Sequence, residues 1–187
     1  MSKKDKAIDQ MVILVDDNDK FLGKYSHRHP AHTGQGSHHR AFVCFLIDKE
    51  GRILLQKRKH WLWDNLWDVS AISHPLHLPD HDESYEEAAV RALKKEMGIE
   101  GVKTEKIGGF NYYEKHPEDE GCENEYCAIM TGRYDGLVTP DPDDVYEYKW
   151  MKFDEFVADV KTNPVLYTPW VCLMTKTLEK EGKYFVL

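Results

Sequence analysis

Three histidines and two glutamates in this chain are of the types that bind divalent cations. His32 lies in a polar segment, His39 opens an apolar one, and His74 follows a short apolar run. Glu123 and Glu125 stand two apart in a predicted strand, which places both carboxylates on one face, about 7 Å apart. Like charges there repel unless a cation or an arginine lies between them. Imidazoles combined with carboxylates suit Zn²⁺ or Mn²⁺, although each group alone also fits a solvated surface.

A sixth candidate, Glu96, lies in the last turn of a predicted helix and borders its apolar stripe. A carboxylate at this position meets the negative end of the helix dipole, which costs about 0.3–1 kcal/mol. Two interpretations follow. The side chain is either solvated at the edge of the stripe or directed at a cation.

One helix that carries such a residue is well marked. Ser84 and Glu87 form a capping-box pattern, and Gly98 is a typical residue at a helix C-terminus. The positions between them form an apolar stripe: Tyr85, Ala88, Ala89, Ala92, Leu93 and Met97. Two further helices are predicted, one from Phe153 and one from Thr168-Pro169, where proline occupies the first helical position.

The remaining elements are predicted to be strands. Alternation and β-branched residues indicate strands at 11–15, 21–25, 39–47, 52–57 and 67–72, and near 102–110, 123–133 and 145–151. Residues 27–38, rich in His, Gly, Pro and Ser, are predicted to form a loop. Many strands with a few helices predict an α+β sandwich.

Composition restricts the function classes. The chain has 187 residues, which fits one domain over residues 11–187 after a disordered N-terminus at 1–10. The net charge of −8 argues against nucleic acid as a partner but permits a small anionic substrate. No apolar run is long enough to cross a membrane, and no secretory signal precedes the domain, so a cytoplasmic protein is expected. The four cysteines are expected to be reduced thiols. Nothing in the sequence fixes the oligomeric state.

Six separated motifs, in this order and approximate spacing, resemble those of the type 1 isopentenyl-diphosphate isomerases. They are His32…His39-Arg-Ala-Phe, Leu66-Trp67, Ser73-His74-Pro75, Arg91-Ala-Leu-Lys-Lys-Glu96-Met-Gly-Ile99, Glu123-Asn-Glu125 and Thr168-Pro-Trp170. The resemblance runs from about Met11 to Leu178 and implies a Nudix-type α/β/α sandwich with a mixed β-sheet.

The resemblance also implies two metals and their ligands. One divalent ion, Mn²⁺ or Zn²⁺, would be held by five residues: His32, His39, His74, Glu123 and Glu125. Glu96 would bind a second ion, Mg²⁺, which bridges to the diphosphate of the substrate.

Further residues acquire roles through the same resemblance. Arg28 and Arg58 match positions that bind the diphosphate. Tyr112 and Glu125 match the groups that deliver a proton to the alkene. Trp170 matches the aromatic residue whose π-face stabilises a tertiary carbocation.

The sequence departs from the family at the position of its catalytic cysteine. That cysteine precedes the histidine of the His-Pro pair by two residues, and here the position is Ile72. Strand alternation keeps Ile72 on the face of His74, but its side chain cannot exchange a proton. The loss of one acid–base group usually costs about 10²–10⁴-fold in rate. Cys127 shares strand parity with Glu125 and is either a replacement or a small buried hydrophobe.

Two other departures concern the substrate pocket. Ala92 replaces a family arginine near the diphosphate. The segment from Arg58 to Trp67 is about two residues short and contains Trp61 and Trp63, which either reshape the substrate mouth or pack ordinarily.

Three functions therefore remain in view. The first is an isopentenyl-diphosphate isomerase-like enzyme that acts on a prenyl diphosphate. The second is a Nudix hydrolase of a prenyl or nucleoside diphosphate, which the Nudix box makes less favourable because Ala92 and Lys95 stand where two of its carboxylates belong. The third is a non-catalytic diphosphate binder.

Overall fold

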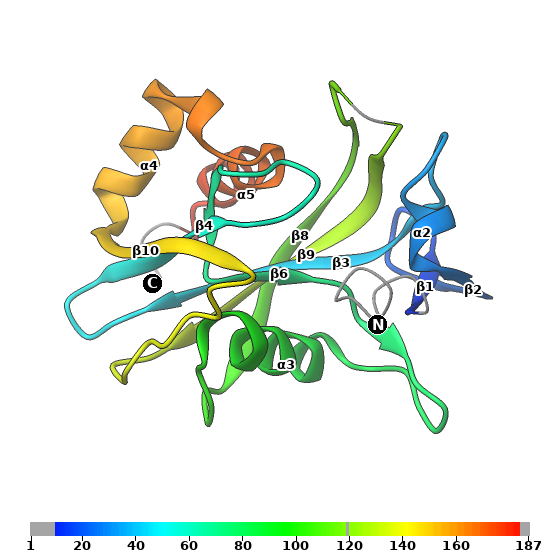
Figure 1. Ribbon diagram of the computed structural model, residues 1–187, viewed down its shortest axis with the longest axis horizontal. Coiled ribbons are helices and arrows are strands. Elements are labelled where there is room, and N and C mark those ends of the chain that lie inside the picture. The colour runs from blue at the N-terminus through cyan, green and yellow to red at the C-terminus, as the bar shows by residue number, and fades with distance from the viewer. Residues whose placement is uncertain (1–9, 119, 184–187) are drawn as a thin grey trace.

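A mixed, curled β-sheet lies between two helical layers in the computed structural model, which describes residues 10–118 and 120–183 (Figure 1). Its strands are β1 (Met11–Val15), β2 (Phe21–His27), β3 (His39–Ile47), β4 (Arg52–Arg58), β5 (Trp67–Val69), β6 (Ala71–Ser73), β7 (Leu76–His77), β8 (Thr104–Lys115), β9 (Cys122–Arg133) and β10 (Val145–Lys152). The helices are α2 (Arg28–Ala31), α3 (Tyr85–Met97), α4 (Phe153–Thr162), the 3₁₀ turn η1 (Pro164–Leu166) and α5 (Pro169–Lys180).

Strand β3 is the centre of the sheet. It runs parallel to β9, from the pair His39 and Glu125 to the pair Ile47 and Arg133, and antiparallel to β6. Strand β8 pairs with the far side of β9, while β4 pairs with β5 and β10. Strand β1 joins β2 and β7. Because β3 has neighbours on both sides, its backbone is fully engaged and its side chains are buried on both faces.

The two faces of β3 support two cores. Ala41, Val43 and Phe45 belong to the core under α4 and α5, whereas Phe42 and Cys44 belong to the core under α3. Figure 1 shows α4 and α5 on one side of the sheet and α3 on the other. The predicted α/β/α sandwich with a mixed sheet is therefore correct.

Local signals placed the helices well. The Ser84 Oγ accepts from the Glu87 backbone N–H (3.1 Å), and the Glu87 carboxylate accepts from the Ser84 N–H (2.7 Å), so the predicted capping box is present. Gly98 ends α3 in the left-handed region (φ 65°), where a side chain would also collide with the Thr139 carbonyl. One prediction was wrong: the segment 27–38 is not all loop, because α2 forms one short helical turn within it. The predicted disorder of residues 1–10 falls outside the described residues except at Gln10.

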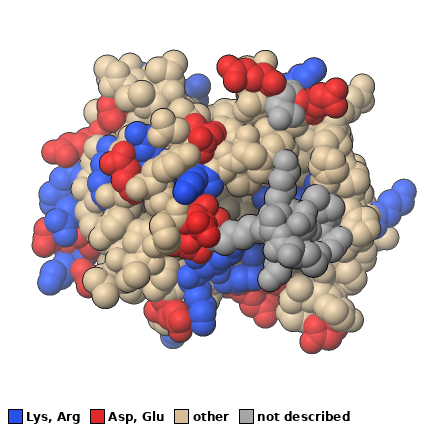
Figure 2. All heavy atoms as spheres, in the orientation of Figure 1, with Lys and Arg blue, Asp and Glu red and all other residues tan. Residues whose placement is uncertain are grey.

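The surface shown in Figure 2 carries acidic and basic side chains side by side, with a hollow near its centre.

Among the described residues, no helix has the length and apolarity needed to cross a membrane.

The strand predicted over 67–72 is interrupted at Ser70, which is fully buried. The Ser70 hydroxyl accepts from the Leu46 backbone N–H (2.9 Å) and donates to the Leu54 carbonyl (2.8 Å). These bonds link β3 and β4, which share only one backbone pair, Ile47 with Ile53. Ser70 thus bridges the place where the sheet splits, and both β5 and β6 depend on it.

We expect Ser70→Ala to destabilise the fold, because it leaves a buried N–H and a buried C=O without partners. Each such group costs about 1–3 kcal/mol. Urea unfolding monitored by circular dichroism measures the change, and Ser73→Ala, at a half-buried position of the neighbouring strand, is the control. Equal stabilities of the two variants would contradict this role for Ser70.

Candidate metal centre and active site

Three imidazoles and one carboxylate meet on the α5 side of the sheet. His39 opens β3 and lies opposite Glu125 in the parallel β3–β9 ladder. His74 directly follows β6, and His32 follows α2. All four residues are buried, and each offers a ligand atom within 4.8 Å of the others. Segments more than 90 residues apart in the sequence therefore converge on one point.

The distances within this cluster are those of ligands around a common centre. The His74 Nε2 lies 2.9 Å from Glu125 Oε1, and the His39 Nε2 lies 3.5 Å from the same oxygen. The Nε2 atoms of His32 and His74 are 3.2 Å apart. Glu123 stands at the edge of the cluster, with its Oε2 atom 3.1 Å from His32 Nε2.

Backbone carbonyls fix two of the rings. The Nδ1 of His32 lies 2.7 Å from the Arg28 carbonyl oxygen, and the Nδ1 of His39 lies 2.6 Å from that of Ser37. Each Nδ1 therefore donates a hydrogen bond to a backbone carbonyl, which leaves Nε2 as the ring nitrogen that faces the cluster and is available to a cation. The His39 Nε2 makes no hydrogen bond within the described part of the chain. An orphaned buried nitrogen among carboxylates fits a divalent cation, so this His/Glu group can bind a metal.

The electrostatics of the cluster agree with this fit. Burial lowers the pKa of His39 and lowers that of His74 well below its usual value, so both rings are held neutral. Burial also disfavours the charged form of His32, but the Glu123 and Glu125 carboxylates outweigh it and raise the pKa of His32 to about 10. Burial, with the Glu125 charge beside it, raises the pKa of Glu123 to about 7. Positive charge is favoured at the centre of the cluster.

An ion pair between Arg91 of helix α3 and Glu83, which was not predicted from the sequence, holds the backbone at the candidate ligand His74. The Arg91 guanidinium donates to both oxygens of Glu83 (2.7 and 2.8 Å) and to the His74 carbonyl (2.9 Å). The Glu83 carboxylate also accepts from the Leu76 backbone N–H (3.0 Å). The sequence signal for this pair is weak, because Glu83 precedes the helix, where capping explains an acidic residue equally well, and Arg91 lies in the middle of the helix.

Two residues with roles predicted from the family resemblance lie near the cluster: Tyr112, for proton delivery, and Trp170, for stabilising a carbocation. The Tyr112 hydroxyl donates to Glu125 Oε2 at 2.6 Å, and burial next to Glu125 raises the pKa of Tyr112 well above its usual value. The Trp170 ring, 2% exposed, lies 6.5 Å from the Tyr112 ring between centroids. Tyr112 thus lies between the Glu125 carboxylate and the Trp170 ring.

The residues predicted to bind the diphosphate, Arg28 and Arg58, lie close enough for their charges to interact. The Arg28 NH1 donates to Gln10 Oε1 (3.0 Å), and Arg28 feels the charges of Glu123, Glu125, Arg58 and Glu96. Arg58 stacks over the Trp170 ring, with its Cζ 5.0 Å from the centroid. Glu96 lies apart from the His cluster and accepts a hydrogen bond from Gln56 (2.8 Å). Two cationic side chains, Arg28 and Arg58, therefore stand near the cluster, while Glu96 is held apart from it by Gln56.

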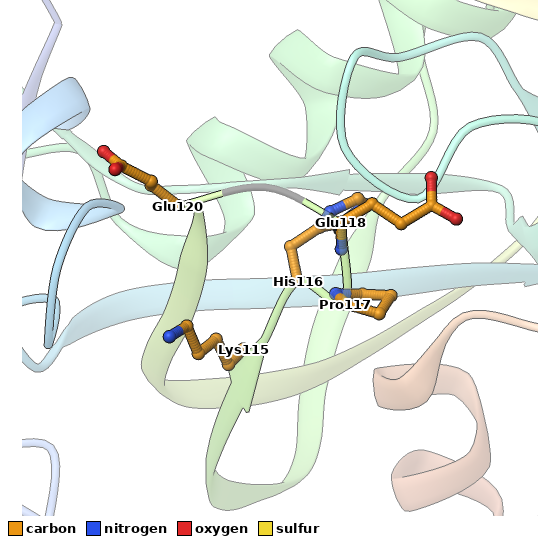
Figure 3. Close-up of a pocket in the computed structure, with 5 residues that line it drawn as sticks. All are labelled: Lys115, His116, Pro117, Glu118 and Glu120. Carbon is orange, nitrogen blue, oxygen red and sulfur yellow. Dashed lines mark hydrogen bonds between the residues drawn. The ribbon is translucent and has the colours of Figure 1, made fainter.

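An open concavity of about 650 Å³ lies at the tip of the hairpin that joins β8 and β9. Figure 3 shows its five lining residues, Lys115, His116, Pro117, Glu118 and Glu120. None of the candidate site residues lines it. Its link to the site is indirect, because His116 packs on Trp63, which packs edge-on against Trp170.

Comparison with known proteins places this geometry in a family. The family model described as NUDIX domain matches residues 37–171. A protein of Halobacterium salinarum with the name isopentenyl-diphosphate Delta-isomerase is 35% identical, over 86% of this chain and 76% of its own length. A protein of Serratia proteamaculans with the same name is 32% identical, over 91% and 92%.

The chain belongs to the isopentenyl-diphosphate Delta-isomerase family. The resemblance drawn from six motifs is thus confirmed. Solved structures add support for the fold alone. DR0079 of Deinococcus radiodurans is 17% identical with a TM-score of 0.67, over 89% of this chain and 98% of that one. A MutT protein of Methanosarcina mazei is 16% identical with a TM-score of 0.60, over 78% of this chain and 96% of that one.

In this member of the isopentenyl-diphosphate Delta-isomerase family, Ile72 occupies the position at which the resemblance implies a cysteine. This residue pairs with Val43 in the β3–β6 ladder and packs against the core that contains Trp170. Cys127 is 1% exposed, and burial raises its pKa well above the usual value, so its thiol is held neutral as a packed apolar group. Ala92 is 1% exposed in the core under α3.

The segment before β5 packs one of its two tryptophans against Trp170 and leaves the other exposed. Trp63 adopts a left-handed backbone (φ 50°) and is 7% exposed, against Trp170. Trp61 instead is 47% exposed. Of these two tryptophans, Trp63 is therefore the packed one and Trp61 the exposed one.

We expect Glu96→Gln to flatten the pH dependence of stability in metal-free protein. Burial raises the pKa of Glu96 to about 7 from its ordinary 4.5. Since the folded pKa is the higher one, the folded state holds the extra proton between these values, and its stability falls as pH rises from about 4.5 to about 7. Glutamine cannot titrate and still accepts from Gln56. Urea unfolding at pH 5 and pH 8 with a chelator tests this, and an equal loss in both proteins would contradict it.

Proposed function

We propose that this protein is a metal-dependent isomerase of isopentenyl diphosphate or a closely related prenyl diphosphate. The observation that carries the proposal is the hydrogen bond of 2.6 Å from Tyr112 to Glu125, in a carboxylate that also touches His74. This bond supports a role for the pair as a proton carrier, because it joins the polar cluster to the aromatic side chains around Trp170. Family membership, and the names of the relatives, support the same substrate class.

The chemistry requires a proton to be added to an alkene and another to be removed from a neighbouring carbon. In our proposal Tyr112 and Glu125 move the proton on one side of the substrate. A positive charge then develops at the tertiary carbon, and the π-face of Trp170, whose ring lies 6.5 Å from that of Tyr112, stabilises it. Arg28 and Arg58 hold the diphosphate.

Metal ions would support this chemistry from two places. His32, His39, His74, Glu123 and Glu125 would hold Mn²⁺ or Zn²⁺, ions that suit mixed imidazole and carboxylate ligands, and Glu96 would hold Mg²⁺ with the diphosphate. Bound cations there supply charge neutralisation for the carboxylates and the phosphate oxygens.

The test is an incubation of the full chain with isopentenyl diphosphate, Mg²⁺ and either Mn²⁺ or Zn²⁺ in D₂O. We expect slow formation of dimethylallyl diphosphate, with deuterium at the carbon that received the proton. Nuclear magnetic resonance of the product measures both. Failure of fully metallated protein to produce it would reject an isomerase function.

The same incubation separates the alternatives. The half-buried Ile72, which offers no second proton carrier on its side, favours a Nudix hydrolase as the second candidate. Release of phosphate or pyrophosphate from a panel of prenyl and nucleoside diphosphates would support that hydrolase instead. Tight binding of the panel without any product would support a non-catalytic diphosphate binder.

A further inference from the structure

A buried aspartate, Asp68, lies directly behind the candidate cation-stabilising indole. It is on β5 and fully buried. Its Oδ2 accepts from the Trp170 Nε1 (2.8 Å) and from the Arg58 NH1 (3.3 Å), and its Oδ1 accepts from the Val69 N–H (2.8 Å). Because it is fully buried, the carboxylate does not reach a substrate directly. It acts on the pocket only through Trp170 and Arg58.

The three side chains form a closed unit. The Arg58 guanidinium lies 5.0 Å from the Trp170 ring centroid, and its side chain is only 13% exposed. A cation fixed this close to the ring would oppose a second positive charge developing on the substrate. The Asp68 carboxylate offsets that charge. It also accepts the indole N–H, which polarises the ring toward greater negative charge on its π-face.

The ionisation of Asp68 agrees with this role. Burial raises its pKa to about 6, although the Arg58 charge and the Trp170 bond act in the opposite direction. The group is therefore mostly a carboxylate at pH 7.5. The anion is kept in this buried place because three donors, from Trp170, Arg58 and Val69, hold it.

We propose that Asp68 is a positioning residue, which orients the Trp170 indole and Arg58 and tunes the indole for binding a cationic substrate carbon. This inference rests on the proposed function, since it deepens the role given there to Trp170. It predicts a property that can be measured without turnover: a preference for a positively charged ligand over a neutral one of the same shape.

The test uses two diphosphates as probes. One carries a tertiary ammonium in place of the branched carbon, and the other is the saturated neutral isopentyl diphosphate. Calorimetry on the metallated full chain measures both affinities at pH 7.5. We expect the wild-type protein to prefer the ammonium probe. We expect Asp68→Asn to weaken that probe about tenfold, a typical scale for a desolvated cation–π contact, and to change the neutral probe by less than about twofold.

Two variants keep this test independent of folding defects. Trp170→Phe removes the indole N–H, so Asp68→Asn should have no further effect on the probe preference in that background. Asp159→Asn is the matched control, because Asp159 accepts from the Tyr167 hydroxyl (2.6 Å) away from the pocket. It should leave both affinities unchanged. Near-ultraviolet circular dichroism reports whether each variant retains its aromatic packing.

The outcomes separate the two proposals. A wild-type preference that Asp68→Asn abolishes supports the role of Asp68, even if the protein does not isomerise isopentenyl diphosphate. Where turnover is seen, Asp68→Asn should lower kcat more than it raises KM. Equal weakening of both probes by Asp68→Asn, no wild-type preference, or no binding of either probe would overturn the proposal.

Discussion

Ile72→Cys should raise the rate of isopentenyl diphosphate isomerisation about 10²–10⁴-fold over the present chain. The position lies on the same side of the sheet as His74 and packs on the core of Trp170. A thiol there would add a second proton carrier opposite the Tyr112–Glu125 pair, whereas the isoleucine side chain exchanges no proton. Initial rates of dimethylallyl diphosphate formation measure the gain, with metal and substrate at saturation.

Ile72→Ser is the matched control for this substitution. Serine has nearly the size of cysteine and opens the same space, but its hydroxyl is too weakly acidic to act without an activating base. A gain confined to cysteine would show that only the acid–base group was missing. If serine gave the same gain, the extra room would be the cause. If neither variant gained, the surrounding residues are not those of a working isomerase.

Glu125→Gln is the second substitution with a large expected effect. The Glu125 carboxylate contacts His74 and accepts a hydrogen bond from the Tyr112 hydroxyl. It also lies 3.5 Å from the His39 Nε2. Glutamine keeps the shape but removes the charge that favours a cation and the group that would take up a proton. We expect activity to fall about 10²–10⁴-fold and Mn²⁺ to bind markedly more weakly. Product assays and equilibrium dialysis measure the two effects.

Glu147→Gln provides the comparison for this loss. Glu147 also lies on a strand, but its side chain is exposed and pairs with Lys57 at 3.2 Å. It should change neither activity nor Mn²⁺ binding. Retention of full activity and metal affinity by Glu125→Gln would remove Glu125 from both of its proposed roles.

The parts of this fold that local sequence determines were predictable. Helix α3 begins at its Ser84–Glu87 box and ends at Gly98, since both signals depend on residues within one turn. The shared face of Glu123 and Glu125 followed from strand alternation. The break at Ser70 was missed, because a hydroxyl that bridges β3 and β4 depends on residues distant in the sequence.

Long-range pairing is the part that the residues alone do not specify. No local pattern states that β9 lies parallel to β3, or that Arg91 reaches the His74 carbonyl from another element. The candidate ligand set therefore came from resemblance to a family, while its geometry came from the structure. The role of Asp68 could not be predicted for the same reason, because the Trp170 indole that donates to its carboxylate is distant in the sequence.

One row of residues across three neighbouring strands has a consequence for changes in chain length. Glu125 lies opposite His39 in the parallel ladder and opposite Tyr112 in the antiparallel one. Deleting a single residue from β9 before Glu125 would turn this carboxylate toward α3 and present a neighbour of opposite parity in its place. An insertion or deletion is therefore expected to be tolerated in the exposed connection after Arg133, whereas the length of β9 before Glu125 must stay the same.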